Sequence, residues 1–221
     1  MSLTRNKSII LVAVFLLLTS LACTSLDGLL PDIGGDDTSE ALKLSDDFSQ
    51  EGSGWEVGSF EGGDIGYFDG KYRVTSNGDG STMWGAAGRS FEDVIIEVDA
   101  KQISAPANNN NDYGVICRLQ RDGAGYYGLV SGDGFFTILR ENGENGFDVL
   151  VDWVESGLIK QGNAQNRIGL SCLGSKISLY VNGELLAETS DSMFSSGDIG
   201  FTVTSYELES TEVHFDNLTV K

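Results

Sequence analysis

The chain has 221 residues and a formal net charge of −19 at pH 7, with 33 acidic residues against 14 Lys and Arg. Such a surface repels phosphate backbones, so the composition argues against nucleic acid and anionic lipid as binding partners. Apolar residues make up 40% of the chain, which is typical of a globular protein and excludes a largely disordered one.

Residues 1–22 have the layout of a secretory signal peptide. Arg5 and Lys7 precede an apolar run over residues 9–18, which is too short to span a bilayer. The segment Ser20-Leu21-Ala22-Cys23 resembles the lipobox of bacterial lipoproteins, in which a diacylglycerol is attached to the cysteine and the chain is cut before it. We therefore expect an extracytoplasmic protein of the bacterial cell envelope, anchored to a membrane through Cys23. The alternative is an ordinary secretory signal in which this cysteine is incidental.

Residues 23–43 are predicted to form a disordered acidic tether. Pro31, Gly34, Gly35, Asp36 and Asp37 offer turn formers and charge with little to bury. Because the signal contains two basic residues and no acid, the chain from Cys23 onward carries 12 basic and 33 acidic residues, a net charge of −21. One domain is expected over residues 44–221.

The pattern from residue 44 onward is that of β-strands. Val94, Ile96 and Val98 alternate with Glu97 and Asp99, as on a strand with one buried face. Short alternating runs of this kind are separated by Gly, Asn and Asp, and no segment shows a helical period. This organisation predicts an all-β domain of two packed antiparallel sheets or a barrel.

Two local features refine the strand prediction. Asn182-Gly183 lies between two alternating runs, and this dipeptide favours the two-residue hairpin turn whose residues both have positive φ. The last run, 213–220, changes phase between Phe215 and Leu218, which predicts a β-bulge near Asp216-Asn217.

Several motifs along residues 44–221 resemble those of concanavalin A-like jelly rolls. They are Asp46-Asp47-Phe48-Ser49 with Gly54-Trp55, Tyr113 to Arg118, Tyr126-Tyr127-Gly128-Leu129, Leu179 to Gly183 and Phe215 to Val220. Within that superfamily the chain most resembles laminin-G-like domains and the 3-keto-disaccharide hydrolase-type domains of bacterial surface lipoproteins. The resemblance implies a two-sheet jelly-roll sandwich, and it says less about function because its motifs are structural.

Cys117 and Cys172 form an even pair in the body of an exported protein, which invites a disulfide. Each alternates with core-facing apolar neighbours, so both thiols are expected to point toward the core. A bridge across 55 residues would stabilise the fold by about 4 kcal/mol in the chain-entropy model. The alternative is two buried free thiols.

No catalytic residue is assigned from the sequence. Glu97 and Asp99 lie two apart on one strand face, and laminarinase-type enzymes of the same superfamily carry Glu-x-Asp-x-x-Glu, but the third acid is replaced here by Gln102. A solvated strand face explains the pair as well. His214 is the only histidine, and no nucleophile is positioned for it in the sequence.

No cofactor is expected, and Ca²⁺ is kept open as a weaker alternative. Three loops are rich in oxygen ligands: 77–80, 108–112 and 131–134. None has EF-hand spacing, and Asn and Asp beside Gly are first of all turn formers.

A ligand-binding patch is predicted on the outer face of one sheet. Sugar sites combine aromatic planes with polar groups. The predicted ligand-binding residues are Glu97, Asp99, Arg118, Gln120, Trp84, Tyr126 and Trp153. The alternatives are a cross-strand ion pair between Arg118 and an acid, and aromatic residues that belong to the core.

Three functions remain open at this point. The leading one is a non-catalytic module that binds carbohydrate or another extracellular ligand. The second is a glycoside-acting hydrolase, which requires an enclosed pocket around Glu97, Asp99 and Arg118 with one carboxyl of raised pKa. The third is a protein-binding scaffold or adhesin, which requires an exposed apolar patch.

Overall fold

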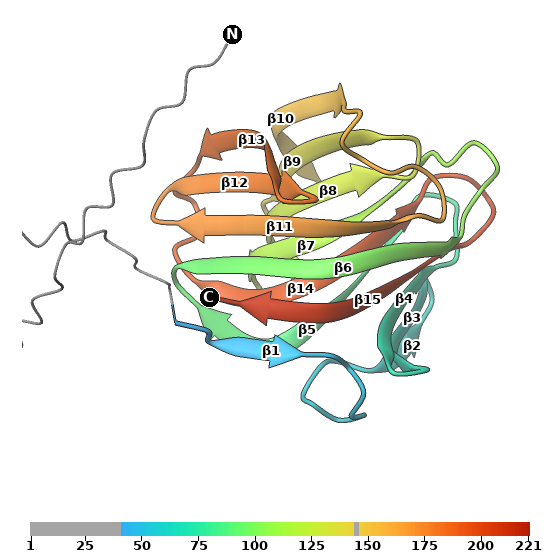
Figure 1. Ribbon diagram of the computed structural model, residues 1–221, viewed down its shortest axis with the longest axis horizontal. Helices are drawn as coiled ribbons and strands as arrows, with labels where there is room; N and C mark the ends of the chain where they lie inside the picture. The colour runs from blue at the N-terminus through green and yellow to red at the C-terminus, as the bar shows by residue number, and fades with distance from the viewer. Residues whose placement is uncertain (1–40, 144–145) are drawn as a thin grey trace, which may run out of the picture. The chain divides into compact units, whose positions relative to one another are not determined.

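The computed structural model of the protein (Figure 1) describes residues 41–143 and 146–221. The predicted signal peptide, the anchor Cys23 and the tether up to residue 40 lie outside the described residues. Within the described part, fifteen strands form two antiparallel sheets and there is no helix, which confirms the all-β two-sheet sandwich. None of these residues forms a helix that is long and apolar enough to cross a membrane.

The larger sheet has nine strands and faces the viewer in Figure 1. In spatial order its strands are β13 (Glu184–Ser190), β12 (Lys176–Val181), β11 (Gln165–Leu173), β6 (Val94–Ser104), β15 (Thr211–Val220), β4 (Lys71–Ser76), β3 (Gly63–Phe68) and β2 (Gly58–Phe60), with β1 (Leu44–Asp46) paired to β15. The last strand of the chain, β15, therefore lies inside this sheet and pairs with β6, β4 and β1.

The smaller sheet has six strands and lies behind the first in Figure 1. Its order is β10 (Phe147–Glu155), β9 (Phe135–Glu141), β8 (Gly125–Ser131), β7 (Asn111–Leu119), β14 (Gly197–Ser205) and β5 (Ser81–Phe91). All residues of β7 and β8 are buried, so both faces of this sheet are covered at its centre.

The main core lies between the two sheets and contains a cluster of aromatic rings. Phe201 stacks on Trp55 with ring centroids 4.5 Å apart and on Phe215 with centroids 4.4 Å apart. Phe48 and Tyr72 complete the cluster and are fully buried. Full burial of such side chains contributes roughly 1.5–3 kcal/mol each, so this cluster is a principal stabilising contact between the sheets.

Cys117 of β7 and Cys172 of β11 form a disulfide that joins the two sheets across the core, with Cα atoms 6.6 Å apart. Two further local predictions are confirmed. Asn182 and Gly183 both have positive φ in the β12–β13 turn. The pairing of β15 with β6 shifts register between Asp216 and Thr219, with Asn217 at φ 52°, as expected for a bulge.

Candidate functional site

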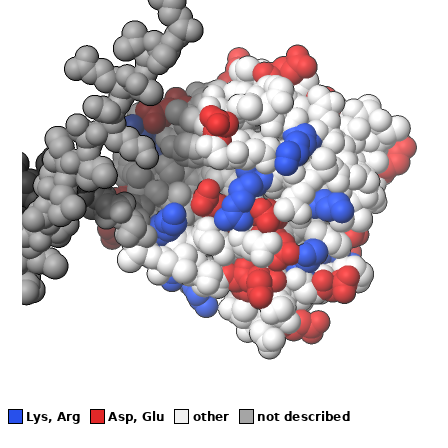
Figure 2. Space-filling model, in the orientation of Figure 1, with Lys and Arg blue, Asp and Glu red and all other residues white. Residues whose placement is uncertain are grey.

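The predicted ligand-binding residues occupy three separate places. Glu97 and Asp99 project from β6 on the outer face of the nine-stranded sheet, where Arg167 lies between them. The Arg167 guanidinium is 3.2 Å from Asp99 Oδ1 and 3.9 Å from Glu97 Oε2, and it donates to the Asn217 carbonyl at 2.8 Å. Figure 2 shows Lys and Arg interspersed with Asp and Glu over this face. It is a surface of solvated ion pairs, each worth about 0–1 kcal/mol.

Arg118 does not join this cluster, and the prediction that it shares a face with Glu97 and Asp99 is wrong. It belongs to β7 of the other sheet, and its φ of 53° marks an extra residue opposite the register shift between Asp198 and Ile199. The bulge turns its side chain into the space between the sheets, where it is only 2% exposed.

The buried guanidinium of Arg118 is held by backbone carbonyls. It donates to the carbonyl oxygens of Glu92 at 3.0 Å and Phe194 at 2.8 Å, and its Nη2 lies 3.4 Å from the Asp93 carboxylate. These contacts tie the β5–β6 turn to the segment before β14. Arg118 therefore has a structural role in holding loops together.

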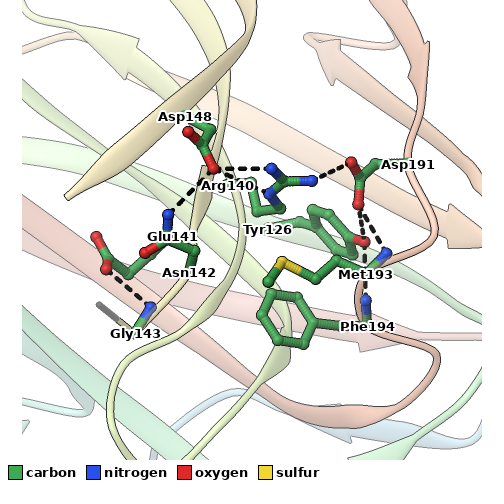
Figure 3. Close-up of polar contacts among 9 residues, drawn as sticks. All are labelled: Tyr126, Arg140, Glu141, Asn142, Gly143, Asp148, Asp191, Met193 and Phe194. Atoms are coloured by element: carbon green, nitrogen blue, oxygen red, sulfur yellow. Dashed lines mark hydrogen bonds and ion pairs between the residues drawn. The ribbon is translucent and has the colours of Figure 1, made fainter. Parts of the chain in front are cut away.

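Tyr126, another predicted ligand contact, is also buried between the sheets. Its hydroxyl donates to Asp191 at 2.6 Å and accepts from the Phe194 amide at 3.1 Å (Figure 3). Arg140 bridges Asp191 and Asp148 in the same network. Burial by itself raises the pKa of Asp191, but the hydrogen bonds from Tyr126 and the Met193 amide, together with Arg140, hold that pKa below its ordinary value.

Gln120 fixes the same segment from the other side. Its Nε2 donates to the carbonyl oxygens of Arg118 and Ser196, each at 2.9 Å. Arg118, Gln120 and Tyr126 thus share one function, which is to anchor residues 191–196. Of the three, Gln120 also borders a hollow on the outer face of the six-stranded sheet.

That hollow contains Trp84, which projects from β5 on the face turned away from the core. It has a volume of about 560 Å³, and its walls also include Glu56, Glu61, Phe60, Leu119, Arg121 and Asp198. Trp84 packs on a second apolar cluster made of Ile116, Leu119, Tyr127, Leu129 and Leu139. A Cβ at Gly123 would lie 3.2 Å from its ring, so this glycine allows the 120–124 turn to lie against the indole.

Trp153 marks a second hollow, of about 530 Å³, near the opposite edge of the same sheet. This Trp153 hollow is lined by Asn110, Asp112, Ser131, Asp133, Phe135, Trp153 and Tyr206. Two of the three oxygen-rich loops, 108–112 and 131–134, therefore meet here. Among residues 41–143 and 146–221, no three His, Cys, Asp or Glu side chains gather in a way that would hold a metal.

A smaller central hollow of about 180 Å³ connects the other two across the sheet. Thr82 lines both the Trp84 hollow and the central one, and Asp112 and Tyr206 line both the central hollow and the Trp153 hollow. Tyr127, Leu129 and Phe147 are among its other walls. We call the three together the groove; it runs over the outer face of the six-stranded sheet, with a tryptophan in each end hollow.

Asp112 is the most perturbed acid in the groove. It is 1% exposed, and its Oδ2 accepts a hydrogen bond from the Tyr206 hydroxyl. Burial raises the pKa of Asp112 to about 6, although the Tyr206 and Thr204 hydroxyls oppose the shift. A buried carboxyl of raised pKa in a hollow is a functional-site candidate.

The sequence reasoning missed both Asp112 and Tyr206 as members of one site. Strand parity could have placed Asp112 on the outer face of the sheet, because it lies on the same side of the strand as Ile116, opposite the core-facing Tyr113 and Val115. Tyr206 lies 94 residues further along the chain, and only tertiary structure brings the two together.

No protein family and no curated protein matches this sequence. Solved structures with the same fold include the carbohydrate-binding module CBM66 from Bacillus subtilis (20% identity, 76% of this chain and 95% of that one, TM-score 0.53). A β-glucanase from Bacillus licheniformis (11%, 83% and 99%, TM-score 0.57) and a legume lectin-like domain from Entamoeba histolytica (14%, 80% and 96%, TM-score 0.57) are also similar. The fold is thus confirmed as a concanavalin A-like jelly roll. The closer likeness to laminin-G-like and 3-keto-disaccharide hydrolase-type domains stays a prediction.

Proposed function

We propose that this domain binds a carbohydrate chain along the groove of the six-stranded sheet, as a lipid-anchored module outside the cytoplasm. The observation that carries the proposal is the continuity of the groove, whose three hollows share walls and whose end hollows each contain a tryptophan. Indole planes pack against the C–H faces of sugar rings, and flanking polar groups bind the hydroxyls.

The polar groups along the groove suit this role. Thr82, Asp112 and Ser131 line it with hydroxyl and carboxylate oxygens, and Arg121 borders the Trp84 hollow with a guanidinium donor. The spread over several strands favours an extended chain of sugar units over a single monosaccharide. The carbohydrate-binding module and the lectin-like domain among the similar structures support the same function by analogy of fold.

The extracytoplasmic setting rests on the sequence. The lipobox-like segment before Cys23 and the acidic tether would place the domain clear of a membrane. The disulfide between the sheets is consistent with an oxidising compartment.

Binding of the full chain to a panel of polysaccharides, in a detergent without sugar head groups, tests the proposal. We expect one class of glycan to bind, and Trp84→Ala or Trp153→Ala to weaken that binding about tenfold, equivalent to ~1.4 kcal/mol for one lost stacking contact. Phe68→Ala is the matched control, since Phe68 is an exposed aromatic residue of the other sheet. Absence of binding across the panel, or an equal effect of the control, would contradict the proposal.

A further inference from the structure

Asp112 has one carboxylate oxygen without a partner. Oδ2 accepts from Tyr206, whereas Oδ1 is buried and receives no hydrogen bond of regular geometry from any described residue. The hydroxyls on the paired strand positions do not satisfy this oxygen. Ser131 donates to Asp133, and the Thr204 hydroxyl, 3.0 Å from that of Thr82, is near enough to lower the pKa of Asp112 but makes no hydrogen bond of regular geometry with it. A buried hydrogen-bond acceptor without a donor lowers the stability of the fold. Asp112 Oδ1 would therefore bind a donor supplied by a ligand strongly.

Tyr206 stands between this oxygen and solvent. It lies just after β14, the residue is 48% exposed, and like Asp112 it lines both the central hollow and the Trp153 hollow. Its hydroxyl is bound to Asp112. A ligand in the groove that replaced the Tyr206 hydroxyl as hydrogen-bond donor would therefore reach the Asp112 carboxylate.

The chemistry of the Trp153 hollow indicates the kind of ligand. Its lining combines two carboxylates, from Asp112 and Asp133, with three aromatic side chains, and includes no Lys, Arg or His. Carboxylates bind an ammonium group through charge-assisted hydrogen bonds, and aromatic faces attract cations. A positive charge would also compensate the buried Asp112 carboxylate, which a neutral hydroxyl does not.

We infer that the Trp153 hollow is a subsite for a protonated amino sugar, whose ammonium group donates to Asp112 Oδ1 while Trp153 and Tyr206 flank the sugar ring. The inference rests on the proposed glycan-binding function and names the class of sugar that the groove selects. The net charge of −19 would attract such a polycationic chain at long range. The subsite would then recognise its ammonium group by direct contact.

The test compares two oligosaccharides that differ only in acetylation: glucosamine oligomers and their fully N-acetylated counterparts. Binding to the full chain is measured by calorimetry at about pH 6.5, where Asp112 is mostly ionised and much of the sugar amine still carries its proton. We expect the glucosamine oligomer to bind at least about tenfold more tightly, the effect of one good charge-assisted contact.

Asp112→Asn should reduce this preference to about twofold or less, and its cooperative thermal unfolding shows separately that the variant is folded. Asp152→Asn is the matched control: Asp152 is an exposed acid of β10 that lines none of the three hollows, and its loss changes the net charge equally. We expect it to keep the preference.

Four results would overturn the inference. Equal binding of both oligomers, or equal loss of preference in both variants, would remove the subsite and leave glycan binding intact. Tighter binding of oligolysine than of the glucosamine oligomer would assign the hollow to a protein ligand. Failure of both oligosaccharides to bind, together with silence across the wider panel, would overturn the proposed function as well.

Discussion

The outer faces of the two sheets differ in the burial and in the partners of their acidic side chains. On the nine-stranded sheet, Glu97 and Asp99 are partly exposed and paired with Arg167, so their charges are compensated within the protein and by water. On the six-stranded sheet, Asp112 is buried among apolar and aromatic side chains with one oxygen unpaired. The acids of the first face are thus compensated without a ligand, whereas Asp112 is not. Of these three acids, only Asp112 has an energetic reason to bind one.

The largest expected effect concerns the disulfide that holds the two faces back to back. Replacing both Cys117 and Cys172 by serine removes the link between β7 and β11. We expect a loss of about 4 kcal/mol in the free energy of unfolding, from the entropy that the unfolded chain regains, and a fall in Tm of roughly 10 °C. Thermal unfolding with and without reductant measures it. If reductant leaves the wild-type Tm unchanged, the bridge does not form in solution.

An intermediate effect is expected at Asp112. Because its folded pKa is about 6, well above the ordinary value of 3.8, the folded chain keeps a proton between about pH 4 and 6 that the unfolded chain has lost. This group therefore lowers stability as pH rises through that window, and the penalty is fully present above it. Asp112→Asn removes the charge and should raise the free energy of unfolding at neutral pH by up to about 3 kcal/mol.

Urea unfolding of the wild type and of Asp112→Asn at pH values near 4 and above 7 checks this sign. The two proteins should differ little in acid and clearly at neutral pH, because the penalty exists only when Asp112 is ionised. The same stability difference at both pH values would show that packing, and not charge, separates them. A gain in stability with a loss of amino-sugar preference would mark Asp112 as a residue retained for binding.

The smallest effect is expected on the ion-pair face. Arg167→Gln breaks the contacts with Glu97 and Asp99, whose side chains and that of Arg167 are all partly exposed. We expect a change below about 1 kcal/mol in the free energy of unfolding, shrinking further at high salt, and no change in glycan affinity. A clear loss of glycan binding in this variant would move the site to the nine-stranded sheet and overturn the comparison.

Strand alternation in the sequence is enough to predict several of these features. It places Glu97 and Asp99 on an outer face, directs Cys117 and Cys172 toward the core, and predicts the bulge near Asp216. Each of these depends on neighbours along the same strand. The prediction of the Asn182-Gly183 turn also depends only on local sequence, because its two residues need positive φ whichever sheet the flanking strands join.

Alternation cannot tell which sheet a strand joins, and this is where the predicted patch failed. β6 and β7 are consecutive in the chain but lie in different sheets, so Glu97 and Arg118 project in unrelated directions. The bulge at Arg118 reverses the strand parity that the sequence suggested. The residue types at this position do not predict a bulge, because arginine rarely adopts positive φ. The groove depends on pairings between distant strands, such as β7 with β14, which bring Asp112 to Tyr206.

The position of β15 also constrains when the domain can fold. Strands β1, β4 and β6 reach their partner only when Thr211–Val220 are present, so the nine-stranded sheet cannot close around a shorter nascent chain. The nine-stranded sheet therefore closes only after synthesis has passed Val220. Folding should accordingly be slow, as is usual when most contacts join distant residues, and removal of Thr211–Val220 should abolish it.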